Sequence, residues 1–247
     1  MNELFQIRRS TRFAAASLLL ALALTGAASP LQAQTNWQDA FAKMPLTNRV
    51  SELNRSNCVA VMLGAFRRNP AVKGLIFMPG ATDEFYFFRR ARATLTNSAP
   101  TLLDAVAALT NQTAIRATVR PPFLLLHTPE DPLEPIEVVE NQKAADAIRR
   151  HNFAKVALYN DRDWDYVAHL LGFYLNTTMI PQAKSYKSNH FFRNSFAAFD
   201  LNGWEALEAT ALAGKTKFTV KKNSIVFEGD PRELAAPSAG GPSLLPP

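Results

Sequence analysis

The residues best suited to acid–base chemistry are a histidine and the two acidic residues that follow it. His127 precedes Glu130 and Asp131 by three and four positions, and an imidazole beside a carboxylate is a pairing that general bases and metal sites both use. The other three histidines show no HxH or HExxH spacing that would bring two ligands to one ion. We therefore expect neither a metal nor a cofactor, and we interpret His127 as a polar residue at the end of a strand.

A second acidic cluster has the alternating aspartates of a calcium-binding loop. Asp161, Asp163 and Asp165 occupy the first, third and fifth positions of such a loop. An EF-hand loop also needs glycine at its sixth position and glutamate at its twelfth, and those positions hold Tyr166 and Gly172. Carboxylates at the start of a helix cap its free N–H groups and complement its dipole. The run is therefore interpreted as the start of a helix.

Basic residues in the first half of the chain suggest a possible anion-binding segment. Arg89, Arg90 and Arg92 follow the aromatic run Phe85–Phe88, and residues 45–130 hold ten Lys or Arg against five Asp or Glu. A basic strand with aromatic rings beside it could bind phosphate or an anionic polymer. The alternative is a solvated strand face above an aromatic core. The net charge outside the first 33 residues is only about +4, so no specific nucleic-acid partner is expected.

The motifs of covalent catalysis are missing from the sequence. It contains no GxSxG elbow, Walker loop or dinucleotide-binding glycine pattern. The single cysteine, Cys58, begins an apolar helical stripe and is expected to be a buried thiol. We predict no enzymatic activity and assign no catalytic residue. An envelope hydrolase with a cleft between two domains stays open as an alternative.

The N-terminus has the three parts of an export signal. Three arginines lie between positions 8 and 12, Phe13–Leu24 is apolar, and Leu31-Gln32-Ala33 forms a cleavage site. We predict a signal peptide over residues 1–33, cut after Ala33. The mature protein is expected to be periplasmic or secreted, with no transmembrane segment.

Behind that signal the sequence repeats itself. Phe87-Phe88-Arg89 recurs as Phe191-Phe192-Arg193, and Leu103-Asp104-Ala105 recurs as Leu207-Glu208-Ala209. The offset between the copies drifts from 106 to 101 residues along the chain, as short insertions in loops would cause. We infer an internal duplication.

The predicted fold class is α+β, with two tandem βαββαβ modules. The first module spans residues 45–130 and the second 155–230, and an acidic, helical linker over 131–154 joins them. A disordered tail is expected over 231–247, because that segment is rich in Pro, Gly, Ala and Ser. The expected strands are 49–53, 75–78, 85–95, 115–119 and 123–126 in the first module and 155–159, 177–180, 191–201, 218–220 and 225–227 in the second. Four of the expected helices begin at Ser56 or Asn57, at Pro100, after Asp163 and at Trp204, with Gly214 as the cap of the last one. A fifth is expected to span Val138–Arg150.

The second module resembles the short N-terminal domain shared by secretins and TonB-dependent receptors. The residues that carry the resemblance are Val156–Asn160, Val167–Leu171, Trp204–Ala209 and the hairpin from Phe218 to Phe227. The match covers roughly residues 155–229 and, more faintly, 49–127. The resemblance implies a small periplasmic α+β module that docks partner proteins.

The sequence therefore predicts an exported, non-enzymatic protein-interaction module of the bacterial cell envelope. Its partners are expected to be envelope proteins, bound through an open strand edge, which is a docking mode that small sheets permit. The alternatives are the envelope hydrolase named above and a binder of anionic polymer that uses Arg89, Arg90 and Arg92.

Overall fold

The computed structural model describes residues 5–7, 37–46, 50–54, 57–67, 72–78, 92–129, 131, 133–158, 164–181 and 195–229. The predicted tail over 231–247 lies outside these ranges, as does the predicted signal peptide apart from residues 5–7. The described part is a mixed α+β fold with three sheets, which confirms the α+β part of the predicted fold class.

The largest sheet has six strands, in the order β1-β8-β10-β3-β6-β5. All its pairings are antiparallel except that of β3 with β6. It contains strands from both halves of the chain. β3, β5 and β6 precede the predicted linker, β8 begins at its end, and β10 follows it. The strands are β1 (Phe5–Ile7), β3 (Gly74–Phe77), β5 (Arg116–Arg120), β6 (Phe123–His127), β8 (Asn152–Leu158) and β10 (Ser195–Asn202).

Two smaller sheets complete the β-structure. The four-stranded sheet has the order β7-β11-β12-β9, and the two-stranded sheet pairs β2 with β4. Their strands are β2 (Glu52–Asn54), β4 (Arg92–Thr94), β7 (Glu137–Val139), β9 (Thr178–Pro181), β11 (Thr216–Val220) and β12 (Ser224–Gly229).

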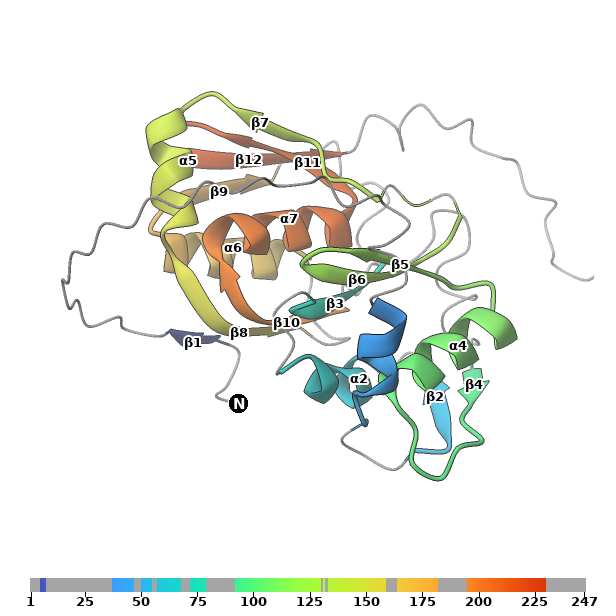
Figure 1. Cartoon of the computed structure of the whole chain (residues 1–247). Coiled ribbons are helices and arrows are strands. Elements are labelled where there is room, and N and C mark those ends of the chain that lie inside the picture. The colour runs from blue at the N-terminus through green and yellow to red at the C-terminus, as the bar shows by residue number, and fades with distance from the viewer. Residues whose placement is uncertain are drawn as a thin grey trace, which may run out of the picture.

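The helices lie in layers on the two faces of the six-stranded sheet (Figure 1). On one face lie α2 (Cys58–Phe66) and α4 (Leu102–Gln112). On the other lie α6 (Trp164–Leu175) and α7 (Gly203–Gly214), with α5 (Gln142–Arg149) beside α7. The four-stranded sheet covers α7 from the far side, so this helix is sandwiched between two sheets. That position explains why ten of its twelve residues are buried.

Alternating strand residues divide the interior into two cores. Ile76 and Leu125 belong to the core that contains α7, whereas Leu75 and Leu124 belong to the core that contains α2 and α4. Successive strand residues point to opposite faces, so β3 and β6, whose apolar residues run without interruption, supply both cores. Cys58 is buried as predicted, and burial raises the pKa of its thiol to about 12.

Each half of the chain has the same order of elements and the same strand pairings. In the first half β2 pairs antiparallel with β4, β3 parallel with β6, and β5 antiparallel with β6. In the second half β8 pairs antiparallel with β10, β9 parallel with β12, and β11 antiparallel with β12. Each half therefore reads βαββαββ. The last β of the predicted βαββαβ is a two-stranded hairpin, and the five strands observed in each half match the five expected in each module.

The two halves are joined edge to edge by β10 and β3. Ser195 to Ala198 pair antiparallel with Phe77 to Gly74. A Cβ on Gly74 would lie 2.3 Å from both the Ala197 carbonyl oxygen and the Ala198 Cβ. Glycine is required here because the backbones approach too closely for any side chain.

Two local predictions were wrong, and each has a tertiary cause. Val138–Arg150 was expected to be helical throughout, but Val138 and Val139 lie in β7, which pairs parallel with β11, and only α5 is helical. Gly214 was expected to cap its helix, but the left-handed residue after α7 is Lys215, with φ 49°. Lys215 adopts a conformation that is uncommon for residues other than glycine, and its side chain contacts a buried partner described below.

We predict that Gly74→Ala destabilises the protein by about 3 kcal/mol, because the new methyl group forces β10 away from β3. Thr178, which occupies the equivalent first position of β9 and is exposed, provides the control. Thr178→Ala is expected to cost no more than about 1 kcal/mol. Urea denaturation of both variants measures the difference, and equal losses would contradict the proposed role of Gly74.

Candidate functional site

The residues predicted to bind anions are only partly described. Arg89 and Arg90 lie outside the described residues. Arg92 lies on β4 with an exposed side chain, and its Nη1 lies 3.4 Å from Glu52 Oε1. An exposed pair of this kind contributes little to stability. The described residues thus place one of the three arginines, in a pair with an acidic neighbour.

His127 lies at the end of β6 and is buried, with 5% of its surface exposed. Its Nδ1 lies 2.7 Å from the Thr128 carbonyl oxygen, and its Nε2 lies 2.9 Å from Thr118 Oγ1. A carbonyl oxygen only accepts, so Nδ1 carries a proton and Nε2 of the neutral ring accepts from the Thr118 hydroxyl. The ring therefore joins β5 to the end of β6, in agreement with a polar strand terminus.

Asp131 does not contact His127. Its Oδ2 accepts hydrogen bonds from the Thr128 N–H and hydroxyl, and its Oδ1 lies 2.8 Å from Lys215 Nζ. The Asp131 side chain is completely buried and that of Lys215 is 8% exposed. Glu130 lies outside the described residues. The hydroxyl, imidazole and carboxylate of a catalytic triad are therefore all present, but the carboxylate is turned toward a lysine instead of the imidazole.

The Asp131–Lys215 pair fastens the start of the linker to the end of α7. Sequence reasoning did not find this pair, because its members are 84 positions apart in the chain. The only local signal was a lysine directly after Gly214. A buried ion pair is held by close geometry and further hydrogen bonds, and the two bonds from Thr128 supply them.

A second charged group lies between α7 and the six-stranded sheet. Lys73 Nζ contacts both carboxylate oxygens of Glu205, at 2.7 and 2.8 Å. Arg120 at the end of β5 lies 3.6 Å from Glu208. Burial raises the pKa of Glu208, and the nearby carboxylates of Glu137 and Glu205 raise it further, whereas Arg120 lowers it. This group contains the ion pairs that join α7 to the first half of the chain.

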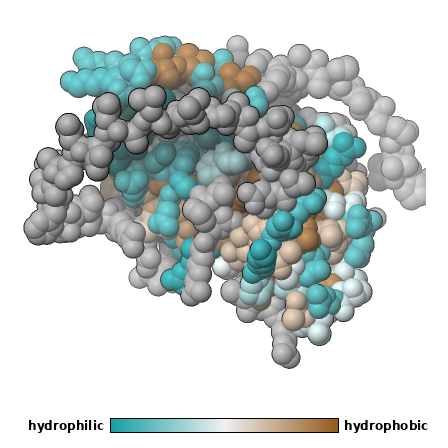
Figure 2. Space-filling view, in the orientation of Figure 1, coloured by the Kyte–Doolittle hydropathy of each residue, from teal (hydrophilic) through white to brown (hydrophobic). Residues whose placement is uncertain are grey.

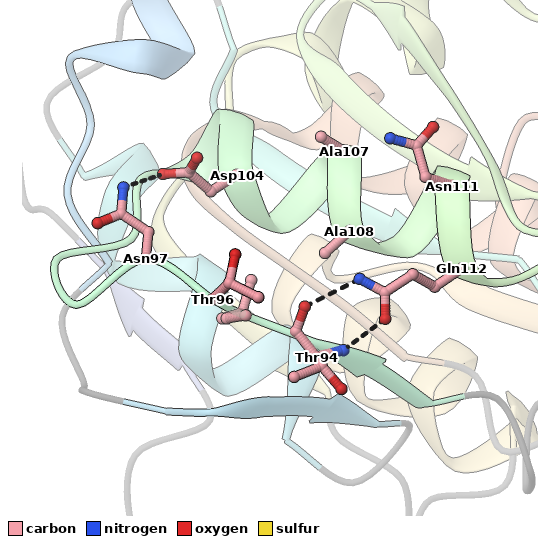
Figure 3. A pocket seen from close by; sticks show the side chains of 9 residues that line it. Thr94, Thr96, Asn97, Asp104, Ala107, Ala108, Asn111 and Gln112 are labelled. Carbon is pink, nitrogen blue, oxygen red and sulfur yellow. Dashed lines mark hydrogen bonds between the residues drawn. The ribbon is translucent and has the colours of Figure 1, made fainter.

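A polar pocket of about 220 Å³ lies between β4 and α4 (Figure 3). Asp104 and Asn97 are at one end, and Gln112 is at the other. The Asp104 carboxylate accepts from the Thr101 N–H, which lowers its pKa and completes a capping box. Because its main polar groups bond one another, the pocket offers few unused partners for a ligand. His127, its partners Thr118 and Thr128, and the Asp131–Lys215 pair, here called the His127 cluster, contribute no residue to the lining of this pocket.

Gln112 occupies the outer edge of β4 (Figure 3). Its Oε1 accepts from the Thr94 N–H at 2.8 Å, and its Nε2 donates to the Thr94 carbonyl oxygen at 2.9 Å. These are the two bonds that a neighbouring strand would form, so the side chain closes this edge. Thr101 is the N-cap of α4 and Asn202 is the N-cap of α7, so the two helices can be aligned at these residues. In this alignment the position of Gln112 in α4 corresponds to that of Ala213 in α7. The second half thus has no side chain to close the edge of β10, and β3 pairs there instead.

The four-stranded sheet presents apolar residues on its outer face. Val138, Thr219, Val226 and Ile180 form one row across its four strands. Val138 and Ile180, on the two outer strands, are each 41% exposed, whereas Thr219 and Val226 between them are buried. Figure 2 shows apolar atoms at the top of the molecule, where Figure 1 places β7.

Comparisons of the chain with models of protein families, with curated proteins and with solved structures give no match. Within the ranges that the structure describes, no three His, Cys, Asp or Glu residues are grouped so that they could hold a metal ion. In the same ranges no helix has both the length and the apolar character needed to cross a membrane.

We predict that Lys215→Met destabilises the protein by about 3–5 kcal/mol, because it leaves the buried Asp131 carboxylate without its cation. Lys217→Met is the matched control, since Lys217 pairs with Glu228 on the partly exposed surface of the same strand region. The control is expected to lose less than about 1 kcal/mol. Chemical denaturation compares the two, and a small loss for Lys215→Met would show that Asp131 is solvated.

We predict that Glu208→Gln becomes more stable relative to the wild type as the pH rises from about 4 toward 7. The folded pKa of Glu208 lies above its unfolded value, so the folded state binds this proton more tightly than the unfolded chain does. Its favourable contribution is present below the unfolded pKa and is lost as the pH rises through the folded pKa. Glutamine stays neutral throughout. Free energies of unfolding measured across this range test the prediction, and a difference that is constant with pH would contradict it.

Proposed function

We propose that this protein is an exported, non-enzymatic interaction module of the bacterial cell envelope, which binds partner proteins through the edges of its sheets. The export signal predicted over residues 1–33 motivates the location. The observation that carries the proposal is the junction of β10 with β3, in which one half of the chain binds the other through strand edges.

We also propose that the two halves arose by duplication into tandem modules. The equal order of elements and the three equal pairings in each half support it. The caps agree as well, because Thr101 and Asn202 both form capping boxes, with Asp104 and Glu205 as their partners. The same order of strand, helix, strand, strand, helix and closing hairpin supports the resemblance to the short N-terminal domain of secretins and TonB-dependent receptors.

The state of the His127 cluster favours a binding function over catalysis. The imidazole is buried and both its nitrogens have partners, and the nearby carboxylate is paired with Lys215. A hydrolytic site needs a base that reaches substrate and a group that orients the base. Here the orienting group is a backbone carbonyl, and the 220 Å³ pocket lies elsewhere, beside α4.

The test is capture of envelope proteins on the immobilised exported form, which begins at Gln34. We expect at least one protein to be retained in near-stoichiometric amount and to resist 0.5 M salt, since strand pairing relies on backbone hydrogen bonds, which salt screens little. The Lys215→Met variant, in which the fold is weakened, is the control bait. Retention of no protein above that control would count against a docking function, and retention of polysaccharide alone would favour the polymer-binding alternative.

A further inference from the structure

Several sheet edges in the described part of the chain are closed or protected. β10 and β3 bind each other, and the carboxamide of Gln112 bonds the outer edge of β4. β9 ends in Pro181, which lacks an N–H group and is a residue that protects edges. β5 carries Arg116 and Arg120 at its two ends. Charged and proline residues on edges discourage pairing.

With β1 left aside, β8 would be the longest of the described strands that end a sheet. It runs from Asn152 to Leu158, and β10 pairs along one side of it. The Phe199 N–H donates to the Lys73 carbonyl oxygen, so the N–H groups of Phe199 and Ala197 face β3 and that of Ala198 faces β8. Antiparallel bonding alternates along a strand. The backbone groups of Val156 therefore bond β10, and those of Lys155 and Ala157 point to the outer edge.

The outer edge of β8 already binds a strand of this chain. Residues Phe5–Ile7 pair with it antiparallel as β1, with Phe5 opposite Val156, Gln6 opposite Lys155 and Ile7 opposite Phe153. A register shift separates Gln6 from Ile7. These three residues lie within the predicted signal peptide, so cleavage after Ala33 would remove β1 and leave the edge of β8 open.

We propose that β8 is the docking edge of the exported protein and that β1 closes this edge until the signal peptide is removed. The proposal rests on the proposed function and specifies its site. The occupant is an extended segment of a partner protein that adds to β8 as an antiparallel strand. Export and docking are thereby coupled, because the uncleaved chain fills its own binding site.

The chemistry of the occupant follows from the register of β1. Apolar residues stand opposite Val156 and Phe153, both of which are buried in the core that contains α7. Lys155 is the only charged residue of β8, and among the described residues it has no ion-pair partner. An acidic residue opposite it would supply a favourable cross-strand pair. The preferred segment therefore has an acidic residue between two apolar ones.

A second copy of the chain fits this edge poorly. Two β8 strands related by a twofold axis pair antiparallel, and a register centred on the strand sets Lys155 opposite the Lys155 of the other copy. Like charges directly opposite each other are destabilising. The charge of β8 thus favours a different protein with an acidic strand.

The experiment uses the decapeptide of residues 1–10 in two forms, Gln6→Glu and Gln6→Lys. The exported form, residues 34–247, retains all the residues of both cores, which lie between Phe41 and Phe227. We expect it to bind the Gln6→Glu peptide about fivefold more tightly than the Gln6→Lys peptide, and Lys155→Glu to reverse that order. Lys222→Glu, in the exposed turn between β11 and β12, is the charge-matched control and should leave the order unchanged.

Full-length protein that retains residues 1–33 should bind either peptide at least tenfold more weakly than the exported form. Equal binding by the two forms would overturn the closure by β1. Failure of the exported form to bind the peptides, or an order that Lys155→Glu does not change, would overturn β8 as the docking edge. Envelope proteins that are captured equally by the wild type and by Lys155→Glu would leave the docking function intact and place it at another edge.

Discussion

The structure depends on the antiparallel pairing of β10 with β3. That pairing joins three strands from the first half to two strands from the second in one sheet, to which β1 adds the sixth strand. The helices of both halves pack on the faces of this sheet. It requires two small residues and a glycine, because Gly74 faces Ala197 and Ala198 with no space for a side chain. It also requires that the edge of β10 is unobstructed. Ala213 in the second half leaves that edge open, whereas Gln112 in the first half closes the equivalent edge of β4. The two halves therefore share an element order but differ at the position that controls assembly.

Ion pairs stabilise this junction along α7 and at its C-terminal end. Lys73 and Arg120 from the first half reach Glu205 and Glu208 on the helix. At its C-terminal end, Lys215 adopts a left-handed conformation and contacts Asp131, just after the first half. Hydrophobic burial is not directional, so it does not by itself align one half with the other. These charged contacts supply that direction, which explains why carboxylates and cations are retained in a largely apolar interface.

Much of the local structure followed from short-range patterns. The helices near Asn57, Thr101 and Trp204 and the hairpin of β11 and β12 are recognisable from capping residues and alternating apolar residues. The strand at Val138 was misassigned to a helix because its partner, β11, lies about 80 residues later in the chain. The candidate site likewise combines a feature that local sequence predicts with one that depends on a distant residue. The polar strand-end role of His127 was predicted from its position, whereas the lysine that takes Asp131 away from it was not.

The sequence by itself determined the α+β class, most of the elements and the fact that they follow the same order in the two halves. These features depend on periodicity and capping within windows of a few residues. Only the tertiary structure decided which edges meet. The free N–H and C=O groups of an edge strand are chemically alike on every strand, so sequence pattern cannot distinguish an edge that pairs from one that a glutamine closes. That distinction required knowing that Gln112 reaches Thr94, that Gly74 lies against Ala198, and that Phe5–Ile7 lies along β8.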